Sequence, residues 1–156
     1  MLAFVGTFII SSLFSFTLFA NDKDDIATIL KQEETPDGVV FELIGSDGEY
    51  LTKSLEKVQN YKIALQKKFP DLDIAVVSHG SEQFALTSDN APKFKKAHAS
   101  VKRLVESDVP VYICETHASW RDVTAEDFPK TISIAAQGPA QIRQYQELGY
   151  TLVVID

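Results

Sequence analysis

The sequence predicts an α/β fold, a three-layer α/β/α sandwich around a five-stranded, mainly parallel sheet. Two observations predict this class: five short apolar runs lie along the chain, and segments with helical spacing of apolar residues separate most of them. The runs are apolar on both faces, so each strand is expected to be buried on both sides. Such strands are typical of a parallel sheet, because every parallel return needs a crossover that covers one face.

The first strand and helix are expected within residues 39–69. The run VVFELI (39–44) predicts a buried strand, and GSDGE after it predicts a loop. An amphipathic helix is then indicated up to Pro70, because apolar side chains recur at helical spacing between lysines and glutamates. Those side chains belong to Leu51, Leu55, Val58, Leu65 and Phe69.

The second and third strands are expected at residues 73–80 and 111–114. DIAVVSHG forms the earlier run and VYIC the later one. Between them, SDNAP (88–92) is a helix-start signal, and apolar residues at helical spacing predict a second helix over 94–105.

The last elements follow in the same alternation. TAEDFP (124–129) predicts one short helical turn, and TISIAA (131–136) predicts the fourth strand. A helix is expected to open at Gly138 and to stop at Gly149. YTLVVI (150–155) is the last predicted strand, so the domain is expected to span 39–156.

The N-terminal segment predicts export. Residues 2–20 contain no Asp, Glu, Lys or Arg and are followed at once by NDKDD, a pattern typical of a secretory signal in residues 1–20. The protein is therefore expected to be periplasmic or otherwise exported. The alternative is an uncleaved membrane anchor, the one case in which a membrane contact is expected. Residues 21–38 are polar and acidic and predict a tether with one helical turn.

The charge balance argues against a nucleic-acid partner. The chain carries a net charge of −7, and its one basic stretch, KFKKAH (93–98), lies within a helical pattern where it is expected to be solvated. No cofactor is expected, because the glycines form neither a dinucleotide-binding nor a phosphate-loop motif. The nucleophile motif of serine hydrolases is missing as well.

The candidate site lies where the strands end. Ligands of parallel sheets bind outside the carboxyl ends of the strands, where helix N-termini also point. Cys114, the single cysteine, ends the third strand, while SHG (78–80) ends the second and QGPA (137–140) ends the fourth. We therefore expect these three loops to meet on one edge of the sheet.

The residues around Cys114 leave three interpretations open. His117 could support a thiolate, His79 would lie nearby, and Arg121 could face the thiolate or an anionic sulfur substrate. On composition alone, a lone cysteine at the end of an apolar strand is more often a packed core residue. The third interpretation is a metal site formed by Cys114, His117 and His79.

Several local strings resemble the DsrE/DsrF-like family of sulfur-relay proteins. VPVYICETHASWRDVTAEDF looks like the family segment in which a strand ends in the sulfur-accepting cysteine, with an arginine several residues later. SLEKVQNYKIAL is similar to the first helix, AVVSHG to the second strand, and GPAQIRQYQELGY to the last helix.

The resemblance implies a five-stranded parallel fold, homo- or hetero-oligomers, and a persulfide carried on Cys114. An exported sulfurtransferase-like carrier is therefore the leading hypothesis, with protein or small-molecule sulfur donors and acceptors as partners. Its supporting residues are expected to be His79, His117 and Arg121. The alternative is a non-catalytic module of the same fold that binds a small ligand or another protein.

Overall fold

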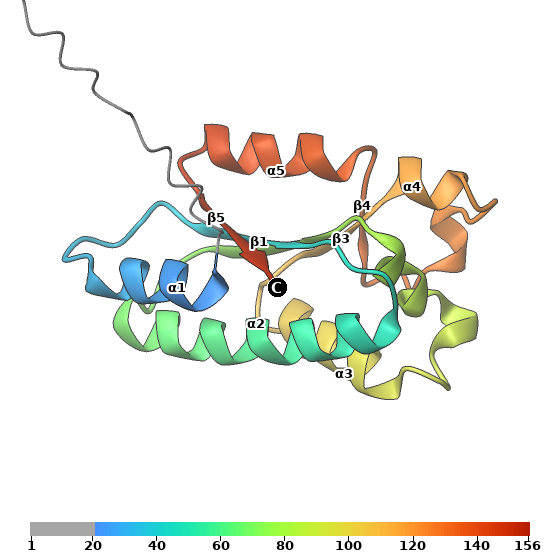
Figure 1. The fold of residues 1–156 in the computed structure, drawn as a ribbon, viewed down its shortest axis with the longest axis horizontal. Coiled ribbons are helices and arrows are strands. Elements are labelled where there is room, and N and C mark those ends of the chain that lie inside the picture. Colours follow the sequence, from blue (N-terminus) through green and yellow to red (C-terminus); the bar gives the residue numbers. More distant parts are fainter. Residues whose placement is uncertain (1–20) are drawn as a thin grey trace, which may run out of the picture.

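Five parallel strands form one sheet in the computed structural model, which describes residues 21–156. The strand order is β4-β3-β2-β1-β5. The strands are β1 (Val39–Leu43), β2 (Ile74–Ser78), β3 (Val111–Cys114), β4 (Ser133–Ala135) and β5 (Thr151–Ile155). The predicted α/β class is confirmed, and the sheet is parallel throughout (Figure 1).

Helices cover the two faces of the sheet unequally. Three of them, α1 (Asp22–Lys31), α2 (Gly48–Lys68) and α3 (Lys95–Val105), lie on one face, and α5 (Gly138–Glu147) lies on the other (Figure 1). A five-residue helix, α4 (Glu115–Ser119), follows β3 directly. Short 3₁₀ turns occur at Ser81–Leu86, Ser88–Asn90 and Ala125–Asp127.

The segment before β1 contains a helix, and this corrects the expectation of a tether with one helical turn. α1 is ten residues long, and Asn21 caps it by accepting a hydrogen bond from the backbone amide of Lys23. Ile26 and Ile29 are buried in the main core cluster, and α1 packs against α2 and β5. The polar composition of residues 21–38 concealed this helix because two isoleucines three residues apart give only a narrow apolar stripe.

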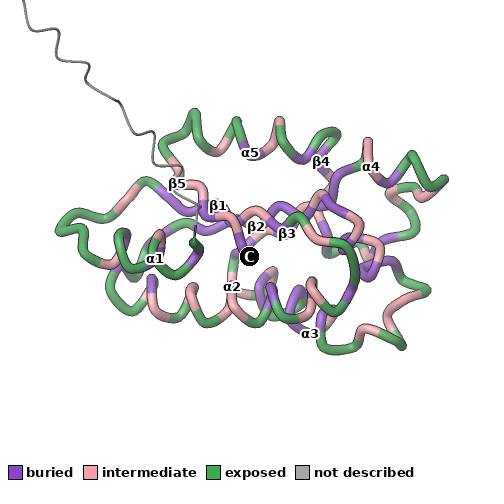
Figure 2. Tube along the Cα trace, in the orientation of Figure 1, coloured by how far each residue is buried: buried purple, intermediate pink, exposed green. Residues whose placement is uncertain are grey.

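The core has two parts, divided by the sheet. The larger lies between the sheet and the layer of α1, α2 and α3, where Phe41 and Leu43 are fully buried. The smaller lies under α5 and consists of Val40, Ala75, Val77 and Ile142. Figure 2 shows the buried residues concentrated along the strands and the inner sides of the helices. Burial on both faces accounts for the apolar strand sequences.

The register of the sheet assigns residues to the face under α5. Glu42 pairs with Val77, and Val77 pairs with Tyr112, so these three side chains share that face. His79 lies two residues after Val77, and Cys114 lies two residues after Tyr112, so both follow on the same face.

No helix among residues 21–156 combines the length and apolarity needed to cross a membrane. The predicted export signal in residues 1–20 lies outside the described residues.

Candidate functional site

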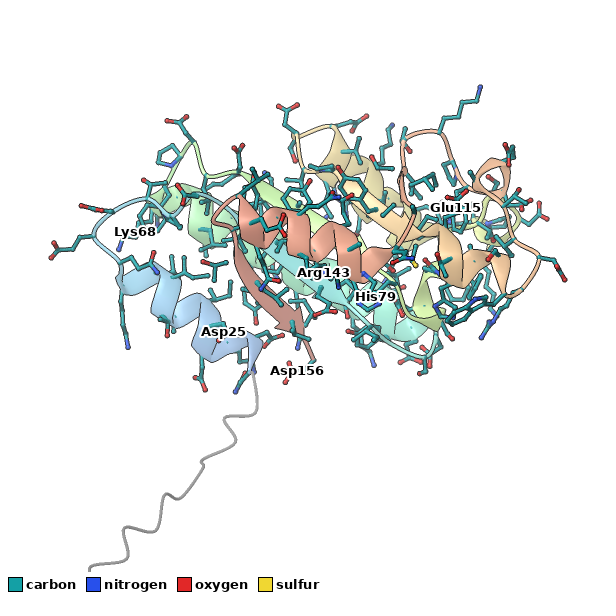
Figure 3. The ribbon with its side chains drawn as sticks, turned by 90° about the horizontal axis from the view of Figure 1, so that it is seen from above. Asp25, Lys68, His79, Glu115, Arg143 and Asp156 are labelled. Atoms are coloured by element: carbon teal, nitrogen blue, oxygen red, sulfur yellow. The ribbon has the colours of Figure 1, made fainter. Side chains whose placement is uncertain are left out.

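A pocket of about 340 Å³ lies at the carboxyl ends of β2, β3 and β4. The three loops expected to meet at this edge do meet there. The pocket is lined by His79, Cys114, Thr116, His117, Trp120, Gln137 and Pro139. Figure 3 shows His79 near the N-terminal end of α5, with Glu115 of α4 on the neighbouring segment.

Cys114 is held in this pocket by hydrogen bonds to its backbone and its thiol. Its backbone amide donates to Gln83 Oε1 at 2.8 Å, and its Sγ accepts from the backbone amide of His117 at 3.4 Å. The residue is 5% exposed and forms no disulfide. The thiol therefore caps α4 and is almost completely buried at the wall of the pocket.

The hydrogen bonds of His117 define its tautomer. Its Nδ1 lies 2.7 Å from the backbone carbonyl oxygen of His79, which can only accept, so Nδ1 carries a proton. In the neutral ring, Nε2 then holds the lone pair. The ring contacts Phe84 edge-on and Trp120 at a tilt, with centroids 5.5 and 5.2 Å apart. The imidazole is thus fixed beside the thiol.

His79 is paired with Glu42, a residue that the sequence interpretation missed. His79 Nε2 lies 2.6 Å from Glu42 Oε1, and the two side chains are 9% and 19% exposed. The sequence does contain a feature that could have indicated Glu42: it is the single charged residue in VVFELI, a strand that is otherwise apolar. A carboxylate at a buried strand position needs a partner, and the register supplies His79 on the next strand.

The N-terminal end of α5 packs directly against the site. A methyl group added at Gly138 would overlap His79 Cβ and lie 3.4 Å from Cys114 Cβ. A glycine is required here because any larger residue would push the helix away from both side chains. The positive end of the α5 dipole, which favours negative charge, therefore lies beside Cys114.

Arg121 lies outside the pocket, which differs from the expectation that it faces the thiolate or substrate. Its Nη2 donates to Ser81 Oγ at 3.0 Å, and its guanidinium carbon lies 4.3 Å from the centre of the Phe84 ring. Since Phe84 also contacts the His117 ring, Arg121 reaches the site through an intervening aromatic side chain. In this conformation it does not contact Cys114.

The metal interpretation is not supported by the geometry. Among residues 21–156, no three His, Cys, Asp or Glu side chains are arranged to hold a metal ion. The arrangement of the side chains decides this, because a hydrogen bond at one ring nitrogen of each histidine is compatible with metal binding at the other. His79 Nε2 binds Glu42, and His117 Nδ1 binds the His79 carbonyl.

Two buried polar residues from the turn after β2 support the site and were also missed. Glu82 is fully buried and accepts hydrogen bonds from the Gly45 amide, the Ser78 hydroxyl and the Gly80 amide. Gln83, also fully buried, accepts from Cys114. In the sequence these residues look like ordinary surface polar residues, so only the structure reveals their role.

The comparisons with known proteins agree with this architecture. A family model described as DsrE/DsrF-like family matches residues 42–155. The structure is similar to that of MTH1491, a protein of unknown function from Methanobacterium thermoautotrophicum, with 18% identity and a TM-score of 0.61 over 74% of this chain and 96% of that one. It is also similar to the ychN protein from E. coli, with 18% identity and a TM-score of 0.60 over 76% of this chain and 98% of that one. No curated protein matches the chain. At these identities the two structures show a shared fold alone.

Proposed function

The chain belongs to the DsrE/DsrF-like family, and we propose that it is an exported, cofactor-free sulfur carrier in which Cys114 accepts sulfane sulfur as a persulfide. One observation carries the proposal: the single cysteine lies in a pocket at the carboxyl edge of the sheet, between two histidines and the N-terminus of α5. The partners are a sulfur donor and a sulfur acceptor, either proteins or small sulfur compounds.

The reaction has two steps. The Cys114 thiolate attacks the outer sulfur of a persulfide donor, so a new bond forms to Sγ while the donor's S–S bond breaks. The electron pair of the broken bond leaves with the donor thiolate, which takes up the proton that Cys114 has lost. An acceptor thiolate then attacks the outer sulfur of the Cys114 persulfide, and Cys114 leaves as a thiolate.

Three features of the structure surround the thiol and suit a nucleophilic sulfur. The amide of His117 donates to Sγ, the positive end of α5 lies alongside, and His79 and His117 line the same pocket. Arg121 contributes only from the outside, through Phe84. Because there is no second cysteine in the chain, the persulfide cannot collapse into an internal disulfide.

Export and self-association belong to the same proposal. The uncharged stretch at residues 2–20 supports export, where a donor would be a small sulfur compound or another exported protein. Family resemblance supports a homo-oligomer. Size-exclusion chromatography with light scattering tests the oligomer, and N-terminal sequencing of the protein recovered from an export-competent host tests cleavage of residues 1–20.

Intact-mass spectrometry tests the sulfur carrier directly. After incubation with a persulfide donor, the wild type should gain the mass of at least one sulfur atom, and dithiothreitol should remove it. Cys114→Ser should gain none. His98→Ala is the matched control, because His98 binds the Ala85 carbonyl and does not line the pocket. A wild type that remains at its original mass with persulfide, polysulfide and thiosulfate donors would refute the proposal.

A second candidate function is favoured by the burial of Cys114, which is only 5% exposed. In this alternative the pocket binds a small ligand or a protein segment, and the thiol merely packs. Iodoacetamide would then react with Cys114 only under unfolding conditions, and Cys114→Ala would fold and assemble as the wild type does. Rapid alkylation of the native protein would exclude this alternative.

A further inference from the structure

Glu42 in β1, His79 directly after β2 and Cys114 at the end of β3 share one face of the sheet. Glu42 is opposite Val77, and His79 follows two residues later on the same face. Ser78 is opposite Ile113, so continuing the register places His79 opposite Cys114. The diagonal and direct neighbours of a sheet are within reach of long side chains. The imidazole therefore lies between the carboxylate and the thiol.

Glu42 and His79 form a short, largely buried hydrogen bond. The separation of 2.6 Å is that of a short, charge-assisted hydrogen bond, and both side chains are largely buried. An ionised carboxylate can only accept, so the pair specifies a proton on His79 Nε2. Nδ1 then carries the lone pair of a neutral ring that lines the pocket.

Other groups around His79 leave this arrangement unchanged. The neighbouring groups that titrate or carry charge are Cys114 itself, His117 and the buried Glu82 at Gly80. His117 uses its Nδ1 proton on the backbone carbonyl of His79 and so does not compete for the His79 ring. Gly138 packs on His79 Cβ and limits the movement of the side chain.

We propose that Glu42 is a positioning residue for Cys114: its carboxylate holds His79 in the Nε2–H tautomer, so that Nδ1 is the acceptor for the thiol proton. This inference rests on the proposed reaction of Cys114. The proton passes from Sγ to His79 Nδ1 as the thiolate forms, and it returns to the departing donor thiolate after sulfur transfer. Glu42 itself gains and loses no proton and touches no reacting atom.

Glu42→Gln separates positioning from a simple structural role. The amide has nearly the same volume as the carboxylate, but it offers a donor as well as an acceptor, so it no longer selects one tautomer. Nitrogen-15 NMR of the imidazoles reads the tautomer directly, and the chain has three histidines to assign. The wild type should show His79 as Nε2–H, and Glu42→Gln should show a new Nδ1–H population.

The rate of Cys114 modification gives the second measurement. Alkylation by iodoacetamide at neutral pH should slow about ten-fold in Glu42→Gln. His79→Ala should be equally slow, and the double variant should be no slower than His79→Ala, because Glu42 acts only through His79. Glu49→Gln, the same chemical change at an exposed glutamate that pairs with Lys53, should match the wild type.

Three results would overturn the inference. His79 could remain entirely Nε2–H in Glu42→Gln, the variant could alkylate at the wild-type rate, or the two substitutions could slow the reaction additively. If Glu42→Gln fails to fold, His79→Ala and the wild-type tautomer still decide, since an Nδ1–H wild type contradicts the assignment. Neither the NMR nor the alkylation measurement uses a sulfur donor. If sulfur transfer alone fails, the carrier function is refuted, but the role of Glu42 in positioning His79 can still be judged from these two measurements.

Discussion

Gln83 Oε1 accepts the backbone amide of Cys114 at 2.8 Å, and this bond joins the turn after β2 to the end of β3. Gln83 is fully buried, and its Nε2 has no partner among the described residues. The Gln83 side chain therefore holds the Cys114 backbone through its oxygen, while its buried amide nitrogen donates no hydrogen bond within the described residues. The Gln83–Cys114 hydrogen bond and the Glu42–His79 pair each join two segments of the pocket that are far apart in the sequence.

Replacing Gln83 by methionine should destabilise the protein and loosen Cys114. The change leaves the buried Cys114 amide without an acceptor, which costs about 1–3 kcal/mol, while removal of the orphaned Nε2 offsets part of that. We expect a net loss of about 1 kcal/mol in urea denaturation and faster exchange of the Cys114 amide with deuterium. Unchanged exchange at Cys114 would show that this bond does not hold the strand end.

Glu82→Gln should be among the most damaging conservative substitutions. The carboxylate accepts from the amides of Gly45 and Gly80 and from the hydroxyl of Ser78. An amide at that position directs two N–H groups toward donors, and each lost bond to a charged acceptor is worth about 1.5–3 kcal/mol. We expect at least about 2 kcal/mol less stability in chemical denaturation. Glu49→Gln is the control, and equal stability of the two variants would contradict this role.

Gly138→Ala should narrow the pocket and slow reactions of Cys114. The added methyl overlaps His79 and touches Cys114, so α5 must move or His79 must leave its rotamer, at a cost of about 1–3 kcal/mol. Alkylation of Cys114 should slow together with a lower melting temperature. Gln144→Ala, at an exposed position of the same helix, should change neither.

Trp120→Ala should leave stability nearly unchanged, because the indole is 73% exposed although it lines the pocket. We expect a change in the free energy of unfolding within about 0.5 kcal/mol. Removal of the indole should increase access to Cys114, because the Trp120 ring packs at a tilt against His117 in the pocket, with ring centroids 5.2 Å apart. Alkylation with a bulky maleimide measures that access, and a rate equal to that of the wild type would show that Trp120 does not restrict entry.

The ion pair between Asp22 and Lys57 should make α1 sensitive to acid. Burial is the largest single influence and raises the pKa of the Asp22 carboxyl, but the hydrogen bond from Lys57 Nζ at 2.9 Å, the interactions with Asp156 and Tyr61 and the positive charge of Lys57 together outweigh it, so the pKa lies below its ordinary value of 3.8. A lowered folded-state pKa contributes stability that is fully present above the unfolded pKa and is lost as the pH falls through the folded one.

Asp22→Asn should therefore destabilise the protein near neutral pH, and its difference from the wild type should shrink below about pH 4. Chemical denaturation at a series of pH values measures this difference. Asp24→Asn removes a charge from the same first turn, where Asp24 is exposed, and serves as the control. A difference that stays constant between pH 3 and pH 7, roughly the range that spans both forms of the carboxyl, would contradict the lowered pKa.

The strand pattern and the position of Cys114 could be predicted because they follow from local rules. Apolar runs at 39–44 and 111–114 became β1 and β3 within one residue of their expected ends. Parallel topology then brought the strand ends together without any further information. The helices over 51–69 and 94–105 followed from apolar periodicity for the same reason.

The partners of the site residues could not be predicted, because they join segments far apart in the chain. Glu42 and His79 are 37 positions apart, and Gln83 and Cys114 are 31 apart. Strand order and register decide such pairs, and neither can be deduced from hydropathy. The contacts of Arg121 could not be predicted for a related reason: its position near Cys114 in the sequence does not indicate that it contacts Ser81 and Phe84.

The presence of one cysteine in 156 residues makes the molecule its own reporter. A fluorophore, spin label or trifluoromethyl tag attached to that sulfur would mark a single point, in the pocket where three loops meet, with no competing background. Occupancy of the cavity, docking of another protein and motion of the nearby indole could each be followed from that one spectroscopic handle.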